Sequence, residues 1–176
     1  GGALEKAGAL GLHVGMFLPT IELLGTKEQR EEWLPRARSL EIIGTYAQTE
    51  LGHGTNLAKL ETTAEYDAST GEFVIHTPSV SATKWWPGGL GKHATHCVLM
   101  AKLILAGVDM GLRSFILPLR SLETHLPLPG IELGDIGPKM GGGYDRVDNG
   151  YLICNRVRVP RSHMLARHGG VDAVGN

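Results

Sequence analysis

Two segments of the chain gather residue types that could hold a flat, polar ligand. The first runs from Gly44 to Asn56 and combines hydroxyl groups, the amide of Gln48 and two internal glycines after an apolar run. Such a loop can present backbone N–H groups and short side-chain donors to the polar edge of a ligand. On composition alone, a polar surface turn is the preferred interpretation of this segment.

The second segment, Lys84–Gly89, reads Lys-Trp-Trp-Pro-Gly-Gly. Successive side chains of a strand point to opposite faces, so one tryptophan can pack in a core while the other forms a flat wall. The two glycines, Gly88 and Gly89, allow a ligand to approach the backbone closely. A core aromatic pair beside a turn is an equally good interpretation.

Two phosphate-binding motifs nearly occur in the same region. The Gly89–Ala94 segment fits the loose dinucleotide pattern G-x-G-x-x-G/A, and Asp109 follows at the offset of about 20 residues that the pattern requires. That pattern needs a helix after the glycines, and the residues here read as a strand, which disfavours a dinucleotide fold. A P-loop is excluded because Gly91-Lys92 is followed by His93 rather than Ser or Thr.

Other common sites have less support. His93 and His96 are spaced like metal ligands, but nothing nearby completes a ligand set, so flanking histidines are preferred. The sequence contains no Gly-x-Ser-x-Gly elbow, which leaves a serine hydrolase unsupported. Cys97 and Cys154 both lie in apolar stretches, and buried free thiols are preferred over a disulfide.

The first third of the chain predicts helices that would precede these segments. Apolar residues recur at helical spacing between Leu10 and Leu24. Thr26 is typical of an N-cap, with Gln29 as its capping-box partner. Pro35, followed by Ala37–Ser39, predicts the end of that helix.

The rest of the chain predicts short strands joined by Gly- and Pro-rich turns. The segment Asp67–Gly71 has hairpin-loop chemistry. The sequence lacks the alternation of strands and helices that is typical of a doubly wound sheet. The fold class expected is therefore mainly β, an antiparallel β-barrel or sandwich preceded by a short helical segment. The β-prone runs span residues 62–66, 72–76, 79–86, 97–105, 112–117 and 151–159.

Composition limits the remaining function classes. The 176 residues carry a net charge of −1, so no basic excess favours nucleic-acid binding. No stretch is apolar enough to span a membrane, and no targeting signal is present. The chain begins at Gly1 without Met and stops at Asn176, from which we expect a piece of a longer protein.

Taken together, the motifs resemble the acyl-CoA oxidase family, a branch of the acyl-CoA dehydrogenase superfamily, over nearly the whole chain. The Tyr-Ala-Gln-Thr-Glu motif at 46–50 and the Lys-Trp-Trp-Pro-Gly-Gly motif at 84–89 are specific to the oxidase branch. Glycine-rich residues 140–144 depart from the usual family turn. The other segments that carry the resemblance span residues 15–19, 40–45, 51–55, 60–64, 127–131, 134–139, 148–151 and 157–160.

The resemblance implies a domain organisation and a cofactor, FAD. Residues 1–38 would end an N-terminal helical domain, and residues 39–176 would form a central β-barrel that binds FAD and acyl-CoA. Gln48 and Thr49 would hydrogen-bond the flavin ring, and Gly88 would contact the isoalloxazine.

The resemblance also implies neighbours of the ring and a place for the substrate. Trp86 and Gly89 would flank the isoalloxazine, and Gly54 and Thr55 would lie near the acyl-CoA thioester. The family's catalytic base is a Glu in a C-terminal helical region that this chain does not contain. Glu50 does not match that base, so no catalytic residue is assigned.

The implied reaction is part of fatty acid β-oxidation. Fatty acyl-CoA would become trans-2-enoyl-CoA, with dioxygen reduced to hydrogen peroxide, in a peroxisomal and homodimeric parent protein. The isolated chain is expected to be inactive and to bind FAD weakly. Two alternatives stay open: an acyl-CoA dehydrogenase that passes electrons to a protein acceptor, and a non-catalytic flavin-binding module.

Overall fold

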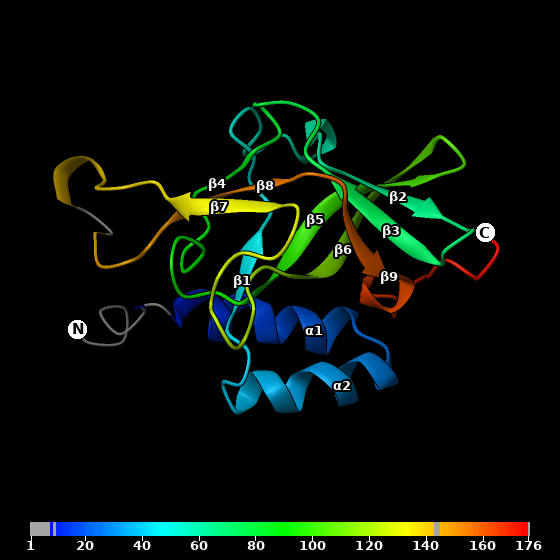
Figure 1. The fold of residues 1–176 in the computed structure, drawn as a ribbon, viewed down its shortest axis with the longest axis horizontal. Helices are drawn as coiled ribbons and strands as arrows, with labels where there is room; N and C mark the ends of the chain where they lie inside the picture. The colour runs from blue at the N-terminus through cyan, green and yellow to red at the C-terminus, as the bar shows by residue number, and fades with distance from the viewer. Residues whose placement is uncertain (1–7, 9, 143–144, 176) are drawn as a thin grey trace.

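The computed structural model describes residues 8, 10–142 and 145–175, which fold into two helices packed against a mainly β body (Figure 1). The predicted order, a short helical segment followed by strands, is confirmed. No helix in this described part combines the length and apolarity needed to cross a bilayer. The helices and strands are α1 (Leu18–Leu24), α2 (Lys27–Arg38), β1 (Gly44–Ala47), β2 (Thr63–Asp67), β3 (Glu72–His76), β4 (Lys84–Trp85), β5 (His96–Leu105), β6 (Val108–Pro118), β7 (Ile131–Asp135), β8 (Gly150–Cys154) and β9 (Val157–Pro160).

The helical segment begins with a π-helical turn, His13–Phe17, that leads directly into α1. The predicted capping box of α2 is confirmed. The backbone N–H of Gln29 donates to Thr26 Oγ1 at 3.2 Å, and the backbone N–H of Thr26 donates to Gln29 Oε1 at 3.0 Å. The predicted helix end at Ala37–Ser39 is confirmed, because α2 ends at Arg38 and Ser39 is its C-cap, but Pro35 lies inside the helix and does not stop it. Its missing N–H costs little there, since both Pro35 and Glu31, whose carbonyl it would have bonded, are exposed.

The strands form two sheets, and the larger one has mixed pairing, which corrects the expected antiparallel barrel. The larger sheet has the order β1-β5-β2-β3-β9, with β6 also paired to β5, and the smaller has the order β4-β8-β7. Both β1 and β2 run parallel to β5, whereas the other named pairs are antiparallel. Parallel neighbours need long connections, and such distant pairings leave no local turn signal in the sequence.

Most predicted strands are present, with three differences. β3 has the predicted bounds, and Gly71 closes the β2–β3 hairpin with a φ of 71°. The run 79–86 contains only β4, and the run 151–159 divides into β8 and β9 around Arg156, whose φ is 53°. Strands β1 and β7 were not predicted.

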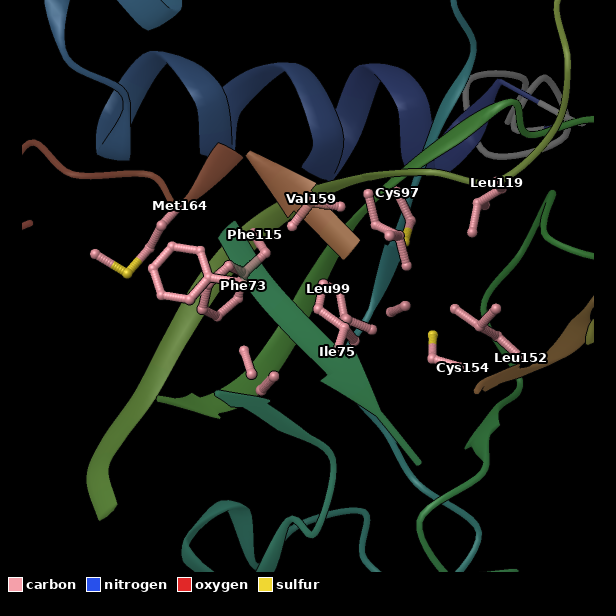
Figure 2. Close-up of a cluster of buried hydrophobic side chains, with 14 of the residues drawn as sticks. Phe73, Ile75, Cys97, Leu99, Phe115, Leu119, Leu152, Cys154, Val159 and Met164 are labelled. Carbon is pink, nitrogen blue, oxygen red and sulfur yellow. The ribbon is translucent and has the colours of Figure 1, made fainter. Parts of the chain in front are cut away.

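Two apolar clusters lie on opposite faces of β5. Phe73, Leu99 and Leu152 belong to the cluster enclosed by the sheets (Figure 2). Val98, the neighbour of Leu99, packs with Phe17 and the helices on the other face. Because most of β5 is buried on both faces, its sequence is a nearly continuous apolar run, interrupted at Lys102, rather than an alternating one. Cys97 and Cys154 are buried free thiols in the first cluster, as expected.

Candidate functional site

A groove of about 520 Å³ opens where four distant segments of the chain meet. It brings together Gln48, Thr49, Trp86 and Gly88, four of the five residues assigned to the flavin by resemblance. The described residues that line it are Gly8, Gly11, Leu12, Met16, Tyr46, Gln48, Thr49, Trp85, Trp86, Pro87, Gly88, Val147 and Asn149. Its walls are therefore aromatic and aliphatic, with few polar groups, which is typical of sites for organic ligands.

The end of β1 supplies the polar side of the groove. Tyr46 Oη donates to Gln48 Oε1 at 3.3 Å, and burial raises the pKa of Tyr46, which keeps this hydroxyl protonated. With its oxygen engaged, the Gln48 amide can offer its nitrogen as a donor to a ligand. The Thr49 carbonyl accepts from the Trp85 amide at 2.9 Å, which joins this segment to the tryptophan segment.

Trp86 forms a partly exposed wall on a constrained backbone. Its φ is 84°, in a region that bulky residues rarely adopt, and its side chain is exposed. The amide of Trp86 donates to the Gly150 carbonyl at 2.9 Å, and its carbonyl accepts from Asn149 Nδ2 at 2.6 Å. Both peptide groups of Trp86 are thus fixed by the segment that begins β8.

Gly88 leaves room in the groove that a side chain would occupy. A Cβ at this position would lie 3.0 Å from Val147 Cγ1 and 3.6 Å from Leu12 Cδ1, and both of these residues line the groove. Thr45 Oγ1 donates to the Gly88 carbonyl at 2.7 Å, which anchors the glycine to β1. A backbone cradle at Gly88, aromatic walls and donors at Gln48 and Thr49 fit a flat ring with a polar edge, such as a flavin.

The remaining predicted site residues lie outside the groove lining. Gly89 is buried with a φ of 79°, and its carbonyl accepts the amides of His93 and Ala94, so it shapes the turn next to Gly88. Gly54 and Thr55 are exposed on the loop after β1. Neither residue lines the groove, although a Cβ on Gly54 would lie 3.9 Å from Cγ2 of the groove residue Thr49.

The structure also shows why the Gly89–Ala94 segment is not a dinucleotide-binding turn. No helix follows Ala94, because β5 begins at His96, as the strand prediction required. Arg120 donates to the carbonyls of Leu90, Gly91 and Ala94. The backbone N–H groups of Lys92 and His93 donate to Asp148 Oδ2, so a carboxylate of the protein already takes the position that a phosphate would need.

His93 and His96 have separate surroundings. His93 is exposed, and its Nδ1 lies 3.0 Å from Oδ1 of the buried Asp148. His96 is buried beside Trp33, with ring centroids 5.8 Å apart, and burial lowers its pKa to about 4. Among the described residues no three His, Cys, Asp or Glu side chains gather as a metal site.

Sequence reasoning did not assign Asn149, Tyr46 or Trp85 to the site. Tyr46 and Trp85 lie within the two predicted segments, so their proximity to assigned residues was a usable signal. Asn149 comes about sixty residues after Trp86, and only the fold brings it there. Its Oδ1 is buried without a hydrogen-bond partner among the described residues.

The sequence matches curated acyl-CoA oxidases along nearly its whole length. A family model described as "Acyl-coenzyme A oxidase N-terminal" matches residues 2–43. The chain is 54% identical to "Peroxisomal acyl-coenzyme A oxidase 1" of Arabidopsis thaliana over 98% of the chain and 26% of that protein. It is 56% identical to "Peroxisomal acyl-coenzyme A oxidase 2" of Oryctolagus cuniculus over 89% of the chain and 23% of that protein.

Solved structures of such enzymes superimpose closely on this fold. Acyl-CoA oxidase-1 of Caenorhabditis elegans, complexed with FAD and ATP, has a TM-score of 0.95 at 52% identity and covers 98% of this chain and 26% of its own. Arabidopsis thaliana acyl-CoA oxidase 1 has a TM-score of 0.94 at 56% identity, and the match covers 96% of this chain and 26% of that one. The chain is similar to acyl-CoA oxidases along nearly its whole length, and it spans about a quarter of the length of these relatives.

Proposed function

We propose that the whole enzyme carrying this chain is an FAD-dependent acyl-CoA oxidase. It converts fatty acyl-CoA and dioxygen to trans-2-enoyl-CoA and hydrogen peroxide in fatty acid β-oxidation. The observation that carries the proposal is the groove, because it joins Gln48 and Thr49 to Trp86 and Gly88 from separate parts of the chain. The similarity to oxidases solved with FAD supports the same ligand here.

Each groove residue has a proposed role in holding the flavin. FAD, when bound, supplies the acceptor for the substrate hydride and the site of dioxygen reduction. Gln48 and Thr49 hydrogen-bond the polar edge of the ring, Gly88 lets the ring approach the backbone, and Trp86 walls one side. Gly89 contributes indirectly, because its turn fixes the position of Gly88.

The acyl-CoA thioester is proposed to lie near Gly54 and Thr55. A Cβ at Gly54 would be 3.9 Å from Thr49 Cγ2, which places this loop directly behind a groove residue. The loop is exposed and so accessible to a large substrate. A crystallised Caenorhabditis elegans relative, acyl-CoA oxidase-2, is bound with FAD and ascaroside-CoA.

The domain boundary and assembly are also proposals. Residues 1–38 would be the end of an N-terminal helical domain and residues 39–176 the FAD- and acyl-CoA-binding domain. The end of α2 at Arg38 and the start of β1 at Gly44 support this division. We further propose a peroxisomal location, because relatives are named peroxisomal acyl-coenzyme A oxidases. We also propose that the whole enzyme is a homodimer, which light scattering would test.

Peroxide formation tests the proposed function. The whole enzyme, in air with a long-chain acyl-CoA and no other electron acceptor, should form hydrogen peroxide and enoyl-CoA in equal amounts. Product formed only with an artificial electron acceptor would indicate a dehydrogenase instead. Absence of product under both conditions would favour a non-catalytic flavin-binding module.

A further inference from the structure

A completely buried ion pair lies behind the groove. Lys84 Nζ is 2.9 Å from Glu50 Oε1, and the two side chains are 1% and 0% exposed. The pair also joins two backbone segments, because Glu50 and Lys84 form an isolated antiparallel bridge. Neither residue lines the groove, yet each is adjacent in sequence to a residue that does: Thr49 precedes Glu50, and Trp85 follows Lys84.

All three protons of the Lys84 ammonium have acceptors. Besides Glu50, Nζ donates to the Gln48 carbonyl at 3.1 Å and to the Met100 carbonyl at 2.7 Å. Gln48 is a groove residue, and Met100 lies in β5. Lys84 therefore connects the polar side of the groove to the central strand of the larger sheet.

The Glu50 carboxylate is equally well satisfied from another direction. It accepts the Glu61 amide at 2.7 Å, the Thr62 amide at 3.0 Å and the Thr62 hydroxyl at 2.6 Å. Burial by itself would raise the pKa of Glu50, but Lys84 and these hydrogen bonds outweigh burial and lower it. Glu50 thus stays ionised even without exposure to water.

A pair of this kind contributes little net stability compared with apolar side chains of the same volume. Removing two charges from water costs nearly as much free energy as their attraction returns. Burial is the main cause that lowers the pKa of Lys84, which shows that cost directly. Apolar side chains in place of the pair would leave the Gln48 and Met100 carbonyls without their shared donor.

We propose that Lys84 and Glu50 are positioning residues for the flavin site. Lys84 holds the Gln48 carbonyl, and Glu50 holds Lys84, so that the 48–49 segment and the 85–88 segment face each other at a fixed separation. The 2.9 Å hydrogen bond from the Trp85 amide to the Thr49 carbonyl lies in the same junction. This inference rests on the proposed function, because it names the means by which that site is kept in shape.

Two variants of the whole enzyme separate positioning from stability. Lys84→Met keeps the length of the side chain but releases the Gln48 carbonyl, while Glu50 retains its three other donors. Glu50→Gln breaks the same ion pair but leaves Lys84 bonded to Gln48. We expect Lys84→Met to weaken FAD binding by about tenfold or more, to shift the visible flavin spectrum and to lower kcat at saturating FAD. Glu50→Gln should have FAD affinity, flavin spectrum and kcat between those of Lys84→Met and those of the wild type.

Gln29→Leu is the matched control. Gln29 is also a buried polar residue with several bonds, including those to the carbonyls of Ser162 and Met164, but it lies outside the groove. Its replacement should lower the melting temperature and leave FAD affinity and the flavin spectrum unchanged.

The outcomes distinguish this inference from the proposed function. If the wild-type enzyme binds no FAD, the proposed function itself is contradicted, whatever the variants do. If the wild type binds FAD but Lys84→Met and Glu50→Gln have wild-type affinity and spectra, the pair is merely structural. If Lys84→Met does not fold, Glu50→Gln alone tests the proposal. A loss of FAD affinity of about threefold or more, with a shifted flavin spectrum, would support a positioning role. Wild-type affinity and spectrum would overturn it.

Discussion

Trp86 shows how a single residue can carry the geometry of the groove. A φ of 84° is strained for a residue with a large side chain, and such strain persists only when the surroundings impose it. Asn149 imposes it through its 2.6 Å bond to the Trp86 carbonyl. Because a carbonyl only accepts, the nitrogen of the Asn149 amide must face Trp86, which leaves its oxygen as the atom without a partner.

Replacing Asn149 should therefore release Trp86. In Asn149→Ala we expect the unfolding free energy to fall by about 1 kcal/mol, the usual net worth of one hydrogen bond, and FAD affinity to fall about tenfold. Chemical denaturation and FAD titration of the whole enzyme measure the two effects. Asn149→Asp keeps the size but places an acceptor against the Trp86 carbonyl, so wild-type behaviour of that variant would contradict the assignment.

At the scale of elements, the groove depends on how the π-helical turn packs against β1. The turn and its approach contribute Leu12 and Met16 to the groove, and β1 contributes Tyr46. The contact between them is so close that a Cβ on Gly44 would overlap the Phe17 ring at Cγ, Cδ1 and Cδ2. The Gly44 amide also donates to His13 Nδ1 at 2.9 Å, which fixes the turn to the strand.

Gly44→Ala should force the turn and the strand apart. We expect it to lower the unfolding free energy by about 1–3 kcal/mol, the usual cost of overpacking a core. Gly15→Ala in the same turn is the control, because a Cβ there meets no atom within 4 Å, and it should leave stability unchanged or slightly raised. Equal destabilisation by the two substitutions would contradict the close-packing argument.

Local signals in the sequence predicted some elements and missed others. The Thr26–Gln29 capping box and the hairpin closed at Gly71 depend on neighbouring residues, and both were predicted correctly. Strand β1 is interpreted as a loop from the sequence because β5, the strand with which it pairs among the described residues, begins about fifty residues later. In the groove, Gln48, Thr49, Trp86 and Gly88 came from the family resemblance, whereas Asn149 required the fold.

At the scale of the whole molecule, three histidines with lowered pKa values, two buried and one half-buried, link stability to pH. Burial lowers the pKa of His13, His96 and His163, and that of His96 falls to about 4. His96 packs against Trp33, with His163 on another side of the same indole and Arg36 over its ring. Protonating His96 in the folded state would place a cation beside the Arg36 and His163 charges.

Stability should therefore decrease as the pH falls from about 6.5 to about 4. In that range the unfolded chain takes up a proton at His96 and the folded chain does not, so protons favour unfolding. His96 alone accounts for up to about 3 kcal/mol. Denaturation across this range measures the slope, and His96→Gln should flatten it; an equally steep slope in the variant would refute the role of His96.

The groove is lined by residues of a chain that spans about a quarter of the length of its relatives. Because the chain spans about a quarter of its relatives, further contacts to FAD are expected from segments outside it. We predict that the isolated 176-residue chain binds FAD at least about tenfold more weakly than the whole enzyme. Isothermal titration of the two proteins makes the comparison, and equal affinity would mean that this chain holds the complete site.

The most direct test of the central claim is a crystal structure of the whole enzyme loaded with FAD. Our account predicts that the isoalloxazine ring lies in the groove, against the Gly88 backbone and within hydrogen-bonding distance of Gln48 and Thr49, with Trp86 along one side. A ring bound elsewhere, with this groove filled by protein side chains, would contradict the account.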